Sequence, residues 1–132
     1  MGHKAINTSN APAAIGPYSQ AVEFMPGAMI FLSGQIPLDP DTGALKMGSI
    51  DEQAHQVMKN LGAVLEAAGV GFGDVVKTTI FLTDMQDFAA VNDIYASYFP
   101  KGGVFPARAT VEVSGLPKGV NVEIDCIARK PD

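Results

Sequence analysis

Several short segments of this chain are apolar in both phases of a strand pattern, and this constrains the fold more than any other feature. The segments are Ile30-Phe31-Leu32, Val75-Val76 and Ile80-Phe81-Leu82. A strand with apolar side chains on both faces has to be covered on both faces. The sequence supplies only two helical patterns, which together shield one face of a sheet. We therefore expect the second face to pack against the same sheet of neighbouring subunits in a closed homo-oligomer. A composition of 47% hydrophobic and 17% charged residues favours such burial.

Two amphipathic patterns predict helices. The first follows Ser49, which we expect to act as the N-cap in a capping box with Glu52, and it continues at helical spacing until Gly69 offers a stop. The second follows Asp84, another candidate cap, and ends before Pro100.

The remaining periodic segments predict strands in the order ββαβαββ. They are Ala21 to Met25 and Met29 to Ser33, joined as a hairpin by Pro26-Gly27, then Val75 to Leu82, Ala107 to Val113 and Val120 to Arg129. The expected fold is a two-layer α/β (α+β) domain over residues 1–132, in which both helices cover one face of a mixed sheet.

Charge and cysteine content exclude several classes of function. A formal net charge of −5 and a pI near 4.8 disfavour a general role on nucleic acid or on anionic membranes. Two histidines and one cysteine cannot form a Cys/His metal site, so we expect no metal. The single cysteine, Cys126, cannot form an internal disulfide. No charged leader with an apolar run opens the sequence, and no run reaches the roughly 20 residues of a membrane span, so the cytoplasm is the expected compartment.

Arg108 is the first candidate for chemistry. It belongs to Phe105-Pro106-Ala107-Arg108-Ala109, at the start of a strand in which Arg108 falls in the opposite phase to Ala109 and Val111. A guanidinium at such a position suits a planar carboxylate, which it can bind through two parallel hydrogen bonds. A surface arginine in an ion pair remains the alternative interpretation.

Glu123 is the second candidate, because aliphatic neighbours flank it in a strand expected to lie inside the sheet. Burial would raise its pKa and allow proton exchange near neutral pH. The alternative is a solvated carboxylate paired with a nearby cation.

Two glycine-containing segments carry hydroxyl groups. Tyr18 follows Gly16-Pro17, and Ser33 precedes Gly34 at the end of an apolar strand, where Gly34 would let a ligand approach the backbone. Each segment alone is also typical of ordinary turns.

Taken together, these segments resemble the YjgF/RidA family of enamine/imine deaminases, also described as reactive intermediate deaminases and endoribonuclease L-PSP-like proteins. The matching motifs run over most of the chain in family order: Gly16-Pro17-Tyr18, Ser33-Gly34-Gln35-Ile36-Pro37, Val76-Lys77-Thr78-Thr79, Val91-Asn92, Phe105-Pro106-Ala107-Arg108 and Val122-Glu123-Ile124. The resemblance implies a chorismate-mutase-like fold with a six-stranded mixed sheet. It also implies a homotrimer with active sites between subunits.

The resemblance further implies cofactor-independent hydrolysis of 2-imino acids, such as 2-iminopropanoate formed from 2-aminoacrylate, to 2-oxo acids and ammonia. Arg108 would then bind the substrate carboxylate, Glu123 would orient water and move protons, and Tyr18 and Ser33 would serve as catalytic and substrate-binding hydroxyls. Gly34 would offer its backbone, and Asn92 would support the site.

One position departs from the family pattern. Family members often carry cysteine two places after the arginine, where this chain has Thr110. The alternative function is a metabolite-sensing or translation-inhibiting, ribonuclease-like regulatory protein of the same fold.

Overall fold

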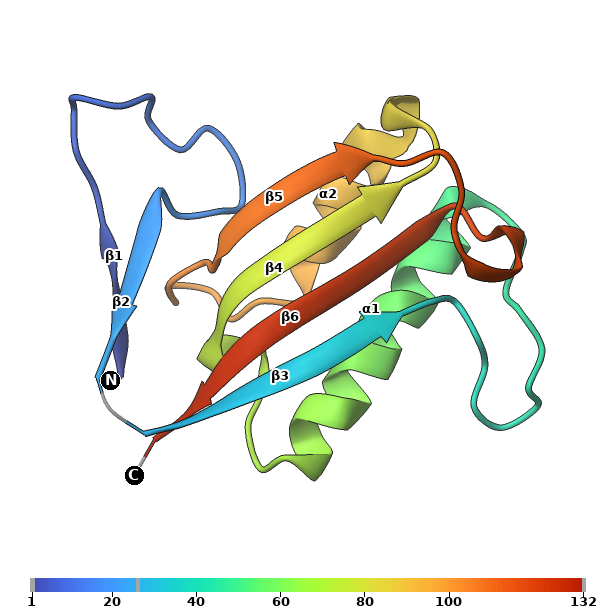
Figure 1. Ribbon diagram of the computed structural model, residues 1–132, viewed down its shortest axis with the longest axis horizontal. Coiled ribbons are helices and arrows are strands. Elements are labelled where there is room, and N and C mark those ends of the chain that lie inside the picture. Colours follow the sequence, from blue (N-terminus) through green and yellow to red (C-terminus); the bar gives the residue numbers. More distant parts are fainter. Residues whose placement is uncertain (1, 26, 132) are drawn as a thin grey trace.

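A computed structural model describes residues 2–25 and 27–131, and it contains six strands and two α-helices (Figure 1). The elements in chain order are β1 (His3–Ile6), β2 (Ala21–Phe24), β3 (Ala28–Gln35), α1 (Ile50–Ala67), β4 (Val75–Leu82), α2 (Phe88–Ser97), β5 (Ala107–Glu112) and β6 (Val122–Lys130), with short 3₁₀ turns at Phe72–Asp74, Met85–Asp87 and Pro117–Gly119.

Four strands form the main sheet in the order β3-β6-β4-β5. The pairs β3/β6 and β6/β4 are antiparallel and β4/β5 is parallel, so the sheet is mixed as predicted. Both helices lie behind this sheet in Figure 1. Strands β1 and β2 form a separate antiparallel pair, joined to the main sheet by a parallel bridge between Ser19 and Ala107.

The predicted hairpin of Ala21–Met25 with Met29–Ser33 is wrong. Strand β2 pairs instead with β1, an element that the order ββαβαββ lacks, and β3 pairs with β6. Pro26, half of the expected turn, lies outside the described residues. A Pro-Gly pair between apolar segments is a local signal, whereas β3 gains a longer ladder from β6 at the other end of the sequence.

The cap of the first helix is confirmed. The Ser49 hydroxyl accepts a hydrogen bond from the Glu52 N–H at 3.2 Å. At the other end, Gly69 adopts a φ of 82° and lets the Gly69 and Val70 N–H groups bond the carbonyls of Glu66 and Leu65.

The second helix begins later than predicted. The Asp84 carboxylate accepts from the Gln86 N–H at 2.9 Å and so caps the short 3₁₀ turn, after which α2 starts at Phe88.

The core lies between the helices and one face of the main sheet. It includes Val57, Leu61 and Leu65 of α1 and Ile80, Leu82, Val122 and Ile124 of the sheet, all buried. In the residues that the structure describes, no helix is long and apolar enough to cross a membrane.

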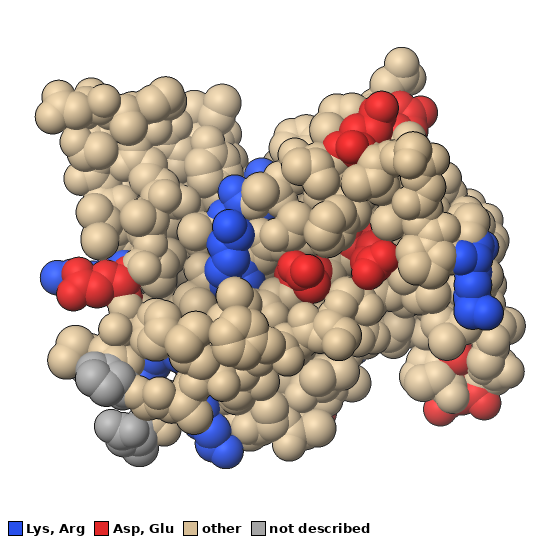
Figure 2. Space-filling view, viewed as in Figure 1, with Lys and Arg blue, Asp and Glu red and all other residues tan. Residues whose placement is uncertain are grey.

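The opposite face of the main sheet carries large apolar side chains that are exposed in the single chain. Phe31 is 70% exposed and Met29 is 49% exposed, both on β3, and Val111 of β5 is 39% exposed. Figure 2 looks onto this side of the molecule and shows mostly uncharged surface around a few charged groups. We call it the open face.

Candidate active site

Arg108 lies on the helix-facing side of β5, the edge strand of the main sheet. Its register partner is Thr78, which is buried under α2. The predicted phase is correct, since Arg108 points away from Ala109 and Val111. The aliphatic side of this strand is the open face, however, and the arginine faces the helices.

The guanidinium of Arg108 is surrounded by an amide and by aromatic rings. Its Nη1 donates a 2.7 Å hydrogen bond to Oδ1 of Asn92. Its central carbon lies 5.4 Å from the ring centre of Tyr18, 5.6 Å from Phe88 and 5.2 Å from Tyr95. Within residues 2–25 and 27–131, no carboxylate forms an ion pair with it. Among the described residues, Arg108 therefore does not take part in a surface ion pair.

Burial lowers the pKa of Arg108 from its ordinary value, and the neighbouring tyrosines act in the opposite direction. Even a lowered pKa leaves an arginine charged at neutral pH. Asn92 occupies one of five N–H donors, so the remaining donors can bind an anion.

Tyr18 is positioned by the residue that follows it. The Ser19 hydroxyl donates to the carbonyl of Phe105, and the Ser19 N–H donates to the carbonyl of Pro106 at 3.1 Å. These bonds fasten the N-terminal segment to the start of β5. Tyr18 and Arg108 are thereby held side by side although 90 positions separate them in the sequence.

A cavity of about 310 Å³ opens beside the guanidinium, lined by Tyr18, Met85, Phe88, Arg108 and Thr110. Met85 and Phe88 lie in the second helical pattern that the sequence predicts after Asp84, and neither was expected to take part in the site. A usable signal was present, because Phe88, Asn92 and Tyr95 are spaced four and three residues apart and share one face of α2.

Glu123 lies on β6, on the open face, directly beside Gly34. A Cβ at position 34 would collide with the Glu123 carboxylate, so only glycine allows this close approach. The β3/β6 register shifts between Leu32 and Gln35, so Ser33 and Gly34 lie in an irregular stretch of β3, and Gly34 lies against the Glu123 side chain. Burial raises the pKa of Glu123, and nearby Asp125 raises it further.

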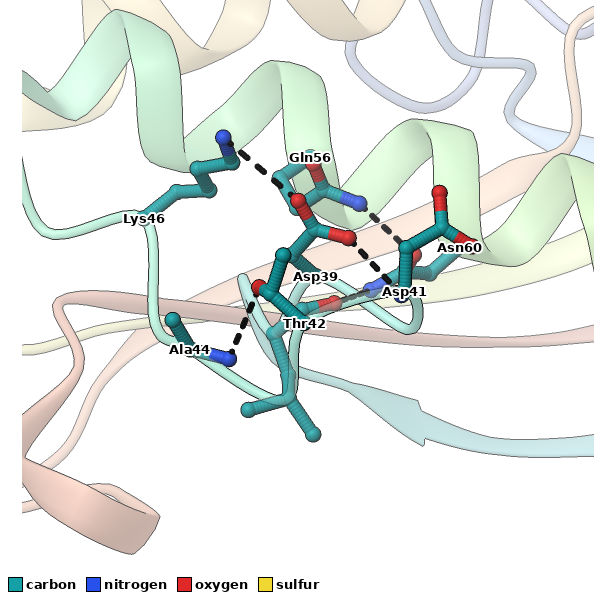
Figure 3. Close-up of polar contacts among 8 residues, drawn as sticks. Asp39, Asp41, Thr42, Ala44, Lys46, Gln56 and Asn60 are labelled. Carbon is teal, nitrogen blue, oxygen red and sulfur yellow. Dashed lines mark hydrogen bonds and ion pairs between the residues drawn. The ribbon is translucent and has the colours of Figure 1, made fainter.

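The loop that leaves this end of β3 is fixed to α1 by polar contacts (Figure 3). Asn60 donates to the carbonyls of Ile36 and Leu38 at 3.0 and 2.9 Å. Farther along, Lys46 lies 3.5 Å from the Asp39 carboxylate. These contacts fix the segment that follows Gly34, and Gly34 itself lies against the Glu123 side chain.

Arg108 and Glu123 do not meet within one chain. Their register partners on the shared neighbour β4 are Thr78 and Phe81, and their side chains point to opposite faces of the sheet. Three residues along the strands and two strand spacings across the sheet separate their Cα atoms by about 14 Å. The chain thus carries two groups: Arg108 with Tyr18 and Asn92, and Glu123 with Gly34, which directly follows Ser33.

Among the described residues, no three His, Cys, Asp or Glu side chains gather as a candidate metal-ligand set.

A family model described as Endoribonuclease L-PSP matches residues 8–130. The chain belongs to the endoribonuclease L-PSP family. This confirms the resemblance to YjgF/RidA proteins. The chain is similar to the protein named "Protein DfrA" of Myxococcus xanthus, with 59% identity over 128 residues that cover 97% of this chain and 96% of that protein. It is 54% identical over 125 residues to the mouse 2-iminobutanoate/2-iminopropanoate deaminase, covering 95% of this chain and 90% of the relative.

Solved structures of similar proteins share the fold. The E. coli YjgF gene product has a TM-score of 0.74 at 49% identity and covers 97% of this chain and 99% of its own. E. coli TdcF, solved with bound serine, has a TM-score of 0.75 at 43% identity with coverage of 97% and 99%. The predicted α/β class, with a mixed sheet and two helices on one face, is confirmed, and six strands are present. They divide into a four-stranded mixed sheet and a separate two-stranded pair instead of the single six-stranded sheet that the resemblance implied.

Proposed function

We propose that this protein hydrolyses 2-imino acids of the 2-iminopropanoate and 2-iminobutanoate type to 2-oxo acids and ammonia, without a cofactor. The observation that carries the proposal is the guanidinium of Arg108, half-buried among aromatic rings beside a cavity and without a carboxylate partner among the described residues. Such a cation is suited to a small organic acid. Relatives with more than 50% identity that are named deaminases support this choice of substrate.

The proposed chemistry assigns one task to each group. Arg108 binds the substrate carboxylate and fixes C2 in place, while Tyr18 and Asn92 keep the guanidinium oriented. Glu123 takes a proton from water as the water oxygen bonds to C2, and it passes this proton to the imine nitrogen, which gives a neutral tetrahedral carbinolamine. The same carboxylate then takes the proton of the new hydroxyl and delivers it to the nitrogen, so that the C2–N bond breaks, the C2=O bond forms and ammonia leaves. The Ser33 hydroxyl and the Gly34 backbone bind the substrate or the water near Glu123.

The two groups have to come from different protomers, because one chain points them to opposite sides of its sheet. We propose a closed homotrimer in which the open faces pack together and each site combines Arg108 of one protomer with Glu123 of its neighbour. The exposed Phe31 and Met29 support burial of the open face.

The proposed activity can be tested in a coupled enzyme assay that follows pyruvate formation. A pyridoxal-phosphate dehydratase acting on serine generates 2-aminoacrylate, and pyruvate formation is followed with and without this protein. Wild-type protein should accelerate pyruvate release, and Arg108→Ala should remove the acceleration. A folded Arg108→Ala variant with full activity would show that the role given to Arg108 is wrong.

Shared sites are tested by mixing two inactive variants, Arg108→Ala and Glu123→Gln, after joint refolding. In a closed ring with random assembly, a site is intact when it draws its arginine from one variant and its glutamate from the other, which occurs at about one quarter of sites. We expect about a quarter of wild-type activity. If both residues of a site came from the same chain, the mixture would stay inactive.

The family description and the relatives named as endoribonucleases keep one alternative in view, namely RNA cleavage or a regulatory binding role. The net charge of −5 argues against broad RNA binding. Cleavage of RNA by purified protein, lost in Glu123→Gln, together with no acceleration of pyruvate release, would favour this alternative.

A further inference from the structure

Gln53 of α1 is a buried polar side chain to which the proposed chemistry assigns no task. Only 2% of it is exposed, and it lies on the buried side of the helix. Its amide holds Asn121, the residue directly before β6. Nε2 of Gln53 donates to Oδ1 of Asn121 at 2.8 Å, and its Oε1 accepts from the Asn121 N–H at 3.0 Å. In Figure 1, the start of β6 accordingly lies beside the first turns of α1.

Thr83, which follows β4, holds Asn121 from a second direction. Nδ2 of Asn121 donates to the Thr83 hydroxyl at 3.0 Å, and the Thr83 N–H donates to the Asn121 carbonyl at 3.2 Å. The backbone N–H, the carbonyl and both side-chain polar atoms of Asn121 therefore each have a partner. A polar network that is satisfied in this way fixes a single conformation, and Gln53 supplies two of its four hydrogen bonds.

Glu123 lies two residues beyond Asn121, close to the end of the strand ladder. In the described part of the chain, the β3/β6 register ends with Gln35 and Ile124, whereas β4 pairs with β6 as far as Val122. The backbone at Glu123 thus has a register partner on one side only. The hydrogen bonds at Asn121 are the next fixed point along the chain, so their loss would let the start of β6 move. A catalytic carboxylate has to stay within about 0.5 Å of its productive position and is sensitive to such motion.

We propose that Gln53 is a positioning residue for Glu123, which it holds in place through Asn121 and the start of β6. This inference rests on the proposed function, since it takes Glu123 to be the group that moves protons in the reaction. Gln53 lies on the helix side of the sheet and Glu123 on the open face. The amide therefore acts through the backbone of β6 and not by contact with the substrate.

The test compares Gln53→Met and Gln53→Glu in the full-length protein. Methionine is unbranched and of similar length, but it leaves the Asn121 N–H and Oδ1 without their Gln53 partners. In the coupled pyruvate assay, kcat should fall at least about tenfold, because the reacting carboxylate is misplaced. KM should stay within about twofold of wild type, because Arg108 binds the substrate from a different strand.

Gln53→Glu is the conservative variant that should restore activity. Its carboxylate still accepts from the Asn121 N–H. The Asn121 amide can turn so that its NH₂ group faces the carboxylate, and the Thr83 hydroxyl can then donate to the amide oxygen. The network is satisfied again, so kcat should stay within about threefold of wild type.

The position of Glu123 can also be followed without turnover, by NMR titration of isotope-labelled carboxyl groups, with Glu123→Gln to assign the signal. Burial raises the pKa of Glu123, and nearby Asp125 raises it further. In Gln53→Met, the loosened side chain gains contact with water. Its pKa should therefore fall toward the ordinary glutamate value of about 4.3.

Ser49→Ala is the matched control for a loss of stability. The Ser49 hydroxyl caps the same helix one turn before Gln53, and its removal should lower the thermal midpoint. It should leave kcat and the pKa of Glu123 unchanged, because Ser49 does not hold β6. A Gln53→Met variant that behaves like Ser49→Ala, with a lower midpoint but with wild-type kcat and Glu123 titration, would overturn the inference.

The outcomes separate this inference from the proposed function. Wild-type protein that does not accelerate pyruvate release refutes the function, and the titration of Glu123 in Gln53→Met then decides the inference by itself. Active wild-type protein together with unchanged kcat in Gln53→Met refutes only the inference. An equal loss of kcat in Gln53→Glu and Gln53→Met also refutes it, since the conservative variant keeps the hydrogen bonds.

Discussion

Replacing Gly34 with alanine should separate activity from stability, because the three atoms nearest to the new methyl group all belong to the Glu123 side chain. A Cβ at position 34 would overlap the carboxylate oxygen and would lie 2.9 Å from Cδ and 3.1 Å from Cγ of Glu123. Carbon atoms pack at about 3.5 Å or more, so Cδ has to retreat by at least about 0.6 Å.

The cost to folding is small because the displaced atoms end a flexible side chain. Turning Glu123 away from its preferred rotamer costs about 1 kcal/mol. Alanine in place of glycine restricts the unfolded chain and returns about 0.4–1 kcal/mol. The net change in the free energy of unfolding should stay within about 1 kcal/mol, which is a shift of no more than about 4 °C in the thermal midpoint.

The cost to catalysis is larger. Misplacing a reacting group by about 1 Å can lower a rate about a hundredfold, so Gly34→Ala should lower kcat at least tenfold. KM should change little, since Arg108 still binds the carboxylate. The assay is the coupled pyruvate measurement, with thermal unfolding of the same samples.

Gly115→Ala is the matched control, because a Cβ there has no neighbour within 4 Å and its φ is not positive. It should leave both kcat and the midpoint unchanged. Full activity in Gly34→Ala, or a loss of activity accompanied by a drop of about 8 °C or more in the thermal midpoint, would contradict this prediction.

Two further predictions concern the open face. Because burial and Asp125 raise the pKa of Glu123, the folded chain holds this proton more tightly than the unfolded chain, and ionisation at rising pH costs stability. Glu123→Gln should therefore unfold at the same temperature as wild type below about pH 4 and at a higher temperature at pH 7; a lower midpoint at pH 7 contradicts the assignment. Phe31→Glu introduces a charge at a position on the open face where the side chain is 70% exposed. It should give monomers in analytical ultracentrifugation and no activity in the coupled assay. The control Val64→Glu, on α1, should leave assembly intact. An active Phe31→Glu monomer would rule out shared sites.

The helices and most strands of the main sheet could be predicted because their signals are local. Ser49, the helical spacing and Gly69 defined α1 to within two residues of its observed end, and alternation placed β4, β5 and β6. Strand β1 was missed, since four residues of mixed character carry no recognisable period. The hairpin failed because pairing partners are chosen across the whole chain.

The site was only partly predictable for a similar reason. Alternation correctly separated Arg108 from its aliphatic neighbours, but period two cannot say which phase will face the helices. That choice depends on β5 joining β4 in parallel, which is a property of topology. The same topology places Arg108 and Glu123 on opposite sides of one sheet, a separation that the motifs alone do not reveal.

The place of β6 in the sheet also bears on how the protein is made. This strand is the last of the fold in chain order, yet it lies between β3 and β4 and hydrogen-bonds to both. Until β6 has been synthesised, the edges of β3 and β4 that pair with it lack hydrogen-bonding partners. Unpaired strand edges of this kind promote aggregation. Folding should therefore be completed after release of the last strand, and chaperone dependence should fall sharply once residues 122–130 have emerged.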